Sequence, residues 1–183
     1  MPHIAVDEEL PGIIGLLHFR PETAGALNDL AETVLRGPST LSRGERELIA
    51  AFVSNRNHCV FCARAHSAIA GAQLDEGPAL VDQVHADPES APIGPKLKAL
   101  LRIADKVRSG GLHVTRTDVA AARAAEATDT EIHDTVLIAA MFCMFNRYVD
   151  GLATFAPDDP AFYARAGQVI AEHGYRLASG VSS

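Results

Sequence analysis

The sequence predicts an all-α fold, and three observations carry this prediction. Alanine-rich segments with apolar residues at helical spacing dominate the chain. No stretch of strand length shows the alternation of apolar and polar residues that is typical of a half-buried strand. Three tetrapeptides, beginning at Ser42, Thr115 and Thr128, fit the capping box that starts many helices. Because no Pro/Gly/Ser-rich stretch divides the chain, we expect a single domain over residues 1–183, with a core of about 11–155.

Start and stop signals divide this domain into successive helices. Gly37-Pro38 and Gly110-Gly111 are clear stops, and the polar segment 54–58 predicts a turn immediately before Cys59. Residues 178–183 are expected to fray at the end of the chain. The expected helices cover about 11–18, 21–36, 42–53, 59–72, 79–85, 94–108, 117–125, 130–148 and 157–173.

The charge balance argues against a nucleic-acid binder. The chain carries 16 Lys and Arg against 23 Asp and Glu, with a formal net charge of -7 and a pI near 5.5. Phosphate neutralisation needs clustered basic residues, whereas the basic residues here are scattered among acidic ones. The expected partners are therefore small molecules or other proteins.

The distribution of apolar residues argues against a membrane protein. The longest apolar run, residues 136–145, is much shorter than the roughly 20 residues that a membrane-spanning helix needs. The first residues lack the basic and apolar regions of an export signal, so a cytoplasmic location is expected. In such a reducing compartment, three cysteines do not predict a structural disulfide framework, and a C-x-x-C is more often catalytic or metal-binding.

Four residues carry most of the functional signal: Cys59, Cys62, His66 and the more distant Glu47. Helix positions i, i+3 and i+7 share one face, so the two sulfurs and the imidazole are expected to lie together. A helix start favours thiolate and lowers the pKa of a thiol from about 8.5 to between roughly 3.5 and 7.5. The His66 ring can exchange a proton with Cys62, and Glu47 can orient that ring.

The pattern Glu47-x11-Cys59-x2-Cys62-x3-His66 resembles the carboxymuconolactone decarboxylase superfamily, specifically its AhpD-like alkylhydroperoxidase branch. A looser resemblance extends over about residues 11–154. It includes Phe145-Asn146-Arg147-Tyr148-Val149-Asp150 and is most similar to the peroxidase-related members.

This resemblance implies an all-α fold that assembles into trimers or hexamers and a redox cycle at the two cysteines. Cys62 would attack a small hydroperoxide or the disulfide of an adaptor protein, and Cys59 would resolve the product. His66 and Glu47 would form the proton relay. The oxidised pair would then be reduced by an external protein dithiol, and no bound cofactor is required.

The chain departs from the best-characterised alkylhydroperoxidases at one position. A second histidine stands between their cysteines, and the corresponding residue here is Phe61. This difference predicts a shorter proton relay. Thiol chemistry is accordingly better supported than peroxidase turnover in particular.

Three alternative interpretations remain open at this stage. The first is a lyase of the carboxymuconolactone decarboxylase type, whose activity would be indifferent to both cysteines. The second is a non-enzymatic redox sensor. The third is structural zinc, with Cys59, Cys62, His66 and Glu47 as four ligands. Attachment of c-type haem fails because Ala63 stands where C-x-x-C-H requires histidine.

The remaining candidates have weaker signals. Cys143 is expected to be a buried, inert thiol, and His58 either tunes the thiolate or lies exposed in a turn. Asn146 and Asp150 either line the site or make only local structural contacts, and the structural interpretation is favoured. The mouth of the substrate pocket is expected to be built from residues 11–19 and a neighbouring subunit. No role is assigned to the histidines at positions 18, 85, 113, 133 and 173, which lack any mutual ligand spacing.

Overall fold

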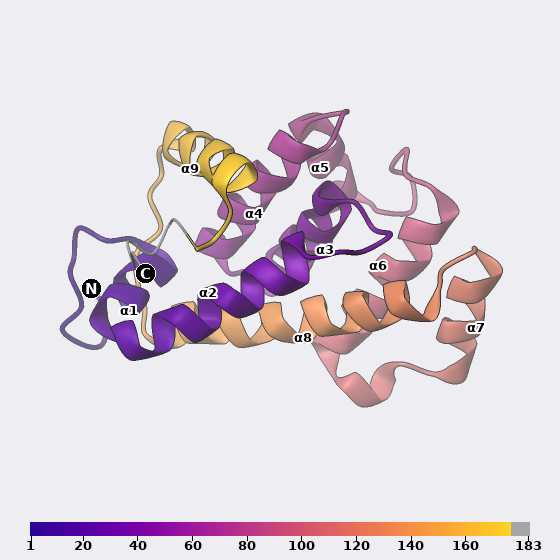
Figure 1. Ribbon diagram of the computed structural model, residues 1–183, viewed down its shortest axis with the longest axis horizontal. Coiled ribbons are helices and arrows are strands. Elements are labelled where there is room, and N and C mark those ends of the chain that lie inside the picture. The colour runs from indigo at the N-terminus through magenta and orange to yellow at the C-terminus, as the bar shows by residue number, and fades with distance from the viewer. Residues whose placement is uncertain (177–183) are drawn as a thin grey trace.

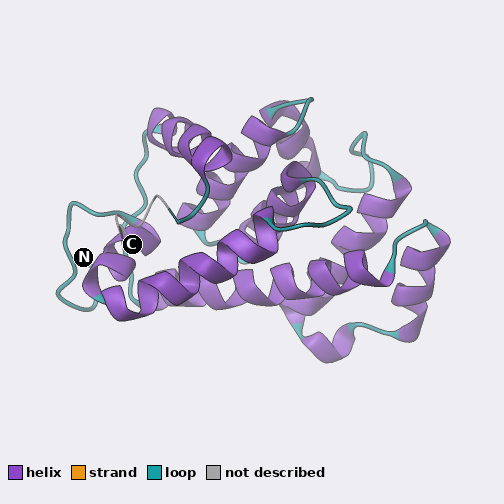
Figure 2. Ribbon diagram, viewed as in Figure 1, coloured by secondary structure: helices purple, strands orange, loops and turns teal. Residues whose placement is uncertain are grey.

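The computed structural model describes residues 1–176, and every regular element in that range is a helix (Figures 1 and 2). The predicted all-α fold is therefore confirmed, and the tail expected to fray at residues 178–183 lies outside the described residues. The elements are α1 (Gly12–Phe19), α2 (Pro21–Arg36), α3 (Arg43–Arg56), α4 (Val60–Gln73), α5 (Pro78–Ala86), α6 (Pro95–Ser109), the 3₁₀ turn η1 (Gly111–His113), α7 (Arg116–Ala124), α8 (Asp129–Gly151) and α9 (Pro160–His173).

The three predicted capping boxes start helices α3, α7 and α8. In each box the serine or threonine hydroxyl accepts a backbone N–H, and the acidic side chain accepts the N–H of the cap residue. These bonds satisfy donors that the first turn of a helix leaves unpaired. Local sequence therefore determines where these three helices begin.

Several helix boundaries differ from the prediction by up to three residues, as at the end of α8, and two of these differences have a specific cause. Helix α3 continues through the polar segment to Arg56, because the Ser54 side chain is fully buried and accepts a hydrogen bond from Asn146 of α8. Helix α9 begins at Pro160 rather than near residue 157, since Asp159 caps it and proline suits the first helical position. In both cases a specific contact moves the boundary by a few residues.

Helix α3 lies at the centre of the fold and is buried on all sides. It packs against α4, α8 and α6, while α9 and α5 pack against α4. Figure 1 shows α8 running along the length of the molecule, with α1 near one end and α7 at the other. A helix in this central position can present side chains to several neighbours at once.

The apolar interior has two parts. The larger cluster is built around α3, α6 and α8. The smaller one lies where α1, the start of α4, the end of α8 and α9 meet, and both cysteines of the C-x-x-C belong to it. Its buried members are Val6, Leu16, Cys59, Phe61, Cys62, Val149 and Tyr163.

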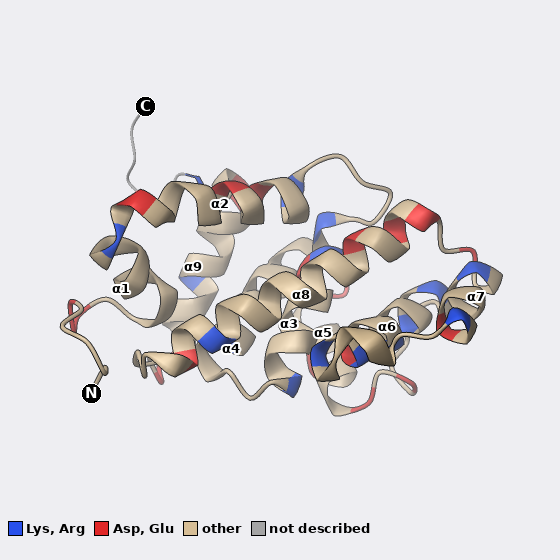
Figure 3. Cartoon of the chain, turned by 90° about the horizontal axis from the view of Figure 1, so that it is seen from below, with Lys and Arg blue, Asp and Glu red and all other residues tan. Residues whose placement is uncertain are grey.

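Acidic and basic residues are mixed along the helices of the described region (Figure 3). Several of them pair, as Lys106 does with Asp118 and Arg102 with Glu89. None of the helices within residues 1–176 has both the length and the apolar character needed to cross a membrane.

Glu131 is a buried charge that joins three parts of the fold. Its side chain is 1% exposed and accepts hydrogen bonds from Lys96 Nζ at 2.7 Å, Thr40 Oγ1 at 3.0 Å and the Thr128 backbone N–H at 2.7 Å. Burial alone would raise the pKa of this carboxyl, but the Lys96 ion pair and the Thr128 and Thr40 hydrogen bonds lower it to about 2. The carboxylate thus links the loop before α3 to the starts of α6 and α8.

We expect Glu131→Gln to lower the free energy of unfolding by about 2 kcal/mol at pH 7, because it removes hydrogen bonds to a charged group. The folded pKa of about 2 lies below the ordinary value of 4.5. The stabilisation is therefore complete above pH 4.5 and is lost as the pH falls toward 2. Urea denaturation across this range measures the difference, and the exposed substitution Glu76→Gln is the control. If the difference in unfolding free energy between wild type and Glu131→Gln did not change with pH, the lowered pKa of Glu131 would be contradicted.

Candidate functional site

A two-residue turn between α3 and α4 positions the cysteine pair. Helix α3 ends at Arg56, and His58 adopts the left-handed conformation with φ 61°. The Cys59 backbone N–H then bonds to the carbonyl of Ser54 at 3.1 Å, and the Cys59 carbonyl accepts the first hydrogen bond of α4. Cys59 is therefore the N-cap residue and Cys62 lies in the first turn, in agreement with the prediction of a C-x-x-C at a helix start.

The two thiols are free and buried, with Cys59 0% and Cys62 3% exposed. A hydrogen bond from Cys59 lowers the pKa of Cys62, as do the charge of His66 and the amide of Asn146, against the opposing effect of burial. The same hydrogen bond, followed by burial, raises the pKa of Cys59. These effects favour Cys62 as the thiolate and Cys59 as the protonated partner whose S–H points to the Cys62 sulfur as a hydrogen-bond donor.

Glu47 and His66 meet as the sequence predicted. His66 Nδ1 lies 2.8 Å from Glu47 Oε2, and the Glu47 side chain is 1% exposed. The His66 ring is held edge-on by Phe142, with ring centroids 4.4 Å apart. Because Nδ1 is engaged by the carboxylate, Nε2 is the ring nitrogen left for exchange with a thiol or substrate.

A fifth residue, Tyr175, completes this arrangement and was missed by the sequence analysis. Its hydroxyl donates to Glu47 Oε1 at 2.5 Å and lies 3.5 Å from His66 Nδ1. Its ring is stacked on the imidazole, with an interplanar angle of 21°. The only local signal was an aromatic residue directly after the helix-ending Gly174, a pattern that does not identify a distant partner.

Asn146 contributes to both structure and site. Its side chain donates to Ser54 Oγ at 3.0 Å and accepts from Asn57 at 2.8 Å, and its amide also favours the Cys62 thiolate. The carboxylate of Asp150 opposes ionisation of both Cys59 and Cys62. The hydrogen bonds of Asn146 fit the structural role that the sequence favours, and both Asn146 and the exposed Asp150 also affect the pKa of the thiols.

Other candidates from the sequence lie away from the sulfurs. Cys143 of α8 is partly exposed rather than buried as expected, and its sulfur accepts a hydrogen bond from the Asn57 side chain. His58 is exposed in the turn. His85 bonds to Ser67 at 2.9 Å on the far side of α4, and His18 lines an apolar cavity described next.

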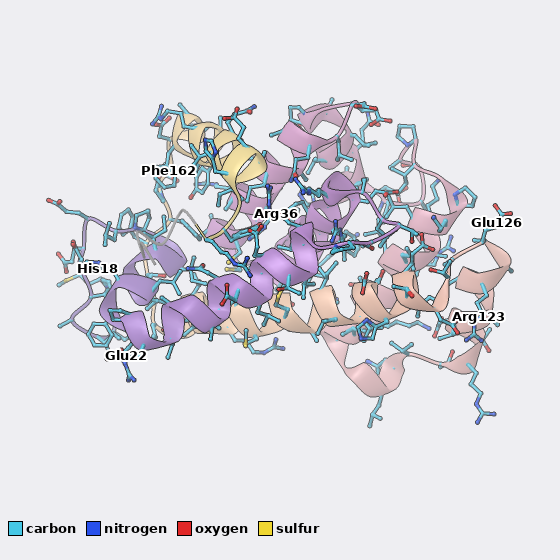
Figure 4. All side chains as sticks on the ribbon, in the orientation of Figure 1. His18, Glu22, Arg36, Arg123, Glu126 and Phe162 are labelled. Atoms are coloured by element: carbon cyan, nitrogen blue, oxygen red, sulfur yellow. The ribbon has the colours of Figure 1, made fainter. Side chains whose placement is uncertain are left out.

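Two mostly apolar cavities with several lining residues in common lie at the thiol site. An inner cavity of about 60 Å³ is lined by Cys62, His66, Tyr175 and the rings of Phe61 and Phe142, among others. An outer cavity of about 650 Å³ lies between α1, α4 and α9, and both cavities share Phe61, His66 and Tyr175. Figure 4 labels His18 and Phe162, which line the outer cavity from opposite sides. Residues of α1 line both cavities, as expected for the pocket mouth.

The Phe61 ring packs directly against the backbone of Gly12, where no side chain would fit. Gly12 has φ +53°, and a Cβ added there would collide with the Phe61 ring. The aromatic wall of the inner cavity therefore depends on a residue from the start of α1.

The zinc interpretation requires Glu47 and His66 to face the sulfurs together. Instead, both oxygens of Glu47 are occupied, one by His66 and the other by Tyr175. Within residues 1–176, no group of three or more His, Cys, Asp or Glu side chains converges as metal ligands would. The donor set does not fit a four-ligand zinc site.

Fold and site together define a class: an all-α protein with a C-x-x-C thiol pair at a helix start and a buried Glu–His pair beside it. Residues 21–106 match the model of the carboxymuconolactone decarboxylase family. Together with the structural relatives below, this match makes the chain similar to the carboxymuconolactone decarboxylase superfamily and to its AhpD-like branch.

Two solved structures are similar to this chain over most of its length. One is an uncharacterized peroxidase-related protein with an alkylhydroperoxidase AhpD core from Ralstonia eutropha JMP134, 29% identical, with a TM-score of 0.76 over 87% of this chain and 82% of that chain. The other is an uncharacterized peroxidase-related protein from Silicibacter sp. TM1040, 27% identical, with a TM-score of 0.75 over 84% of this chain and 78% of that chain.

A third structure, a protein of unknown function from Agrobacterium tumefaciens whose name relates it to AhpD, is 22% identical. Its TM-score is 0.68 over 81% of this chain and 99% of that chain, and it supports the fold alone. A comparison with curated proteins finds no significant match.

Ionisation of Cys62 can be followed by thiolate absorbance at 240 nm as the pH is raised. We expect Cys62→Ser to remove the transition at lowest pH and Cys143→Ser to retain it. Cys59→Ala should move the midpoint upward by about one pH unit, because it removes a hydrogen bond to the charged sulfur. Persistence of the transition in Cys62→Ser would show that another thiol carries the charge.

Asp150 offers a test in the opposite direction. Its negative charge raises the pKa of Cys62, so Asp150→Asn should lower the midpoint of the same titration, by up to about one unit. Asp158→Asn is the matched control, because that side chain is 98% exposed. An unchanged or higher midpoint in Asp150→Asn would mean that the carboxylate does not act on the sulfur.

Proposed function

We propose that this chain is a thiol-dependent oxidoreductase that reduces hydroperoxides, or the disulfide of a partner protein, through Cys59 and Cys62. One observation carries the proposal: Cys62, whose pKa is lowered by its neighbours, lines a mostly apolar cavity whose wall also contains His66. The AhpD-like and peroxidase-related descriptions of the structural relatives support the same reaction class.

The proposed cycle starts with attack on the peroxide. The Cys62 thiolate attacks one oxygen of ROOH, the O–O bond breaks, and the leaving alkoxide takes a proton from His66 to become ROH. Cys62 is then a sulfenic acid. The Cys59 sulfur attacks the Cys62 sulfur, water leaves, and a disulfide forms. An external dithiol reduces this disulfide by two thiol exchange steps and is itself oxidised to a disulfide.

The cavities support an organic substrate. The inner cavity is small and mostly apolar, and the outer one is lined largely by aliphatic and aromatic side chains of α1 and α9. Transfer of an alkyl or aryl group from water to such a surface is favourable by about 25 cal/mol per Å² of buried apolar area. Hydrogen peroxide offers no apolar surface, so we expect organic hydroperoxides to react faster.

Further parts of the proposal come from the resemblance and the sequence. The reductant is expected to be a protein dithiol, because the chain has no nicotinamide or flavin fingerprint. Assembly into trimers or hexamers and a cytoplasmic location remain predictions. Size measurement in solution tests the first of these directly.

The test is consumption of cumene hydroperoxide with dithiothreitol as the regenerating dithiol. We expect the wild type to turn over many times and Cys62→Ser to lose at least about 100-fold in rate, since the attacking sulfur is gone. Cys143→Ser is the matched control and should retain the wild-type rate.

Two other outcomes would replace the proposal. A lyase of the carboxymuconolactone decarboxylase type would keep its activity in both Cys59→Ser and Cys62→Ser. A redox sensor would consume one peroxide per chain and then stop, even with dithiothreitol present.

A further inference from the structure

The Glu47 carboxylate is buried between three segments that are far apart in the sequence. Glu47 lies on α3, His66 on α4 and Tyr175 after α9. The carboxylate uses one oxygen for each partner, with distances of 2.8 Å to His66 Nδ1 and 2.5 Å to the Tyr175 hydroxyl. Both oxygens of the carboxylate are therefore held by hydrogen bonds. Oε2 bonds to His66 of the sequence motif, and Oε1 bonds to Tyr175, which lies outside the motif.

Helix α2 holds Tyr175 in place. The Tyr175 backbone N–H donates to Glu32 at 2.8 Å, and Arg36 bonds to the carbonyls of Ile170 and Ala171 at 2.8 and 3.0 Å. Arg36 also pairs with Glu32 and is labelled on α2 in Figure 4. These contacts anchor the end of α9 and set the position of the tyrosine ring before its hydroxyl meets Glu47.

We propose that Tyr175 is a positioning residue of the thiol site, which holds the Glu47 carboxylate in the orientation that engages His66 Nδ1 and leaves Nε2 facing the cavity. This inference rests on the proposed function of the site and deepens it. Tyr175 lies outside residues 21–106, where the family model matches, so the inference concerns the carboxy-terminal part of this chain.

The physical argument concerns the proton affinity of a buried cluster. His66 pairs with Glu47, and the charge of His66 acts on Cys62, so the three groups form one interacting cluster whose side chains are largely buried. A hydroxyl donor aimed at the carboxylate stabilises its negative charge. Its removal raises the proton affinity of the whole cluster, whichever member carries the proton, so the Cys62 thiolate should form at higher pH.

Other titratable groups face this cluster from several elements. Asp150 of α8 and Cys59 face the Cys62 sulfur. Arg36 and Glu32 of α2 act on Tyr175, with opposite effects on its pKa, which burial raises strongly. All four stay unchanged in Tyr175→Phe, so a shift in that variant reports the lost hydroxyl.

The test compares wild type with Tyr175→Phe, which removes only the hydroxyl and keeps the ring that packs on His66. We expect the midpoint of the 240 nm thiolate titration to rise by about one pH unit, as for loss of a hydrogen bond to a charged group. At pH 7, kcat for cumene hydroperoxide should fall about tenfold while KM changes little, because the cavity walls remain.

Tyr148→Phe is the matched control. It removes a hydroxyl from a half-buried tyrosine on α8 whose ring packs at the smaller apolar cluster, and it should leave the midpoint unchanged. A double variant sharpens the test: once Glu47→Gln has removed the charge, adding Tyr175→Phe should shift the midpoint far less than it does in the wild type.

Each outcome decides the inference. A lower melting temperature with an unchanged titration midpoint in Tyr175→Phe would mean a structural role only and would overturn it. Equal shifts in the wild-type and Glu47→Gln backgrounds would also overturn it, because the hydroxyl would then act independently of Glu47. The titration needs no peroxide, so it decides the role of Tyr175 even if the wild type proves inactive as a peroxidase.

Discussion

The carboxylate of Glu47 is the constraint on which the rest of the site depends. Its side chain projects from the central helix α3 into the interior and is 1% exposed, and a buried carboxylate that loses a partner costs about 3–5 kcal/mol. Its two donors come from α4 and from the segment after α9. Docking of both segments onto α3 is therefore required to satisfy this one group, and it joins Glu47 to His66, which α4 already holds near the cysteines.

The chain contains a second buried carboxylate, and the contrast between the two is informative. Glu131 is paired with Lys96, a permanent cation, and has a depressed pKa. Glu47 instead faces two groups that can each hold or release a proton, His66 and Tyr175. A permanent ion pair gives stability, whereas a carboxylate with titratable partners can take part in proton transfer. This difference supports the proposed role of Glu47 in the thiol site.

Local sequence information predicted the helices, because caps and apolar spacing act within a few residues. The C-x-x-C with His66 was visible for the same reason, since its members lie on two turns of one helix. Tyr175 was not predictable: its partner Glu47 lies 128 positions away, and only packing of α9 on α4 brings them together. The cavities and the contacts of Asn146 with the α3–α4 turn also depend on long-range packing. Hence the motif could be predicted from the sequence, whereas Tyr175 and the Asn146 contacts could not.

Phe61 and Tyr175 distinguish this site from the family motif that it resembles. Where the resemblance places a second histidine between the cysteines, Phe61 contributes an apolar wall that requires Gly12 opposite it. The proposed proton path of the motif then consists of His66 and Glu47. Tyr175 adds a polar group to the same cavity from outside the motif, on the far side of the carboxylate. A site that loses a titratable group next to the sulfur depends more strongly on the orientation of its remaining imidazole, and that orientation is set from the carboxy-terminal segment.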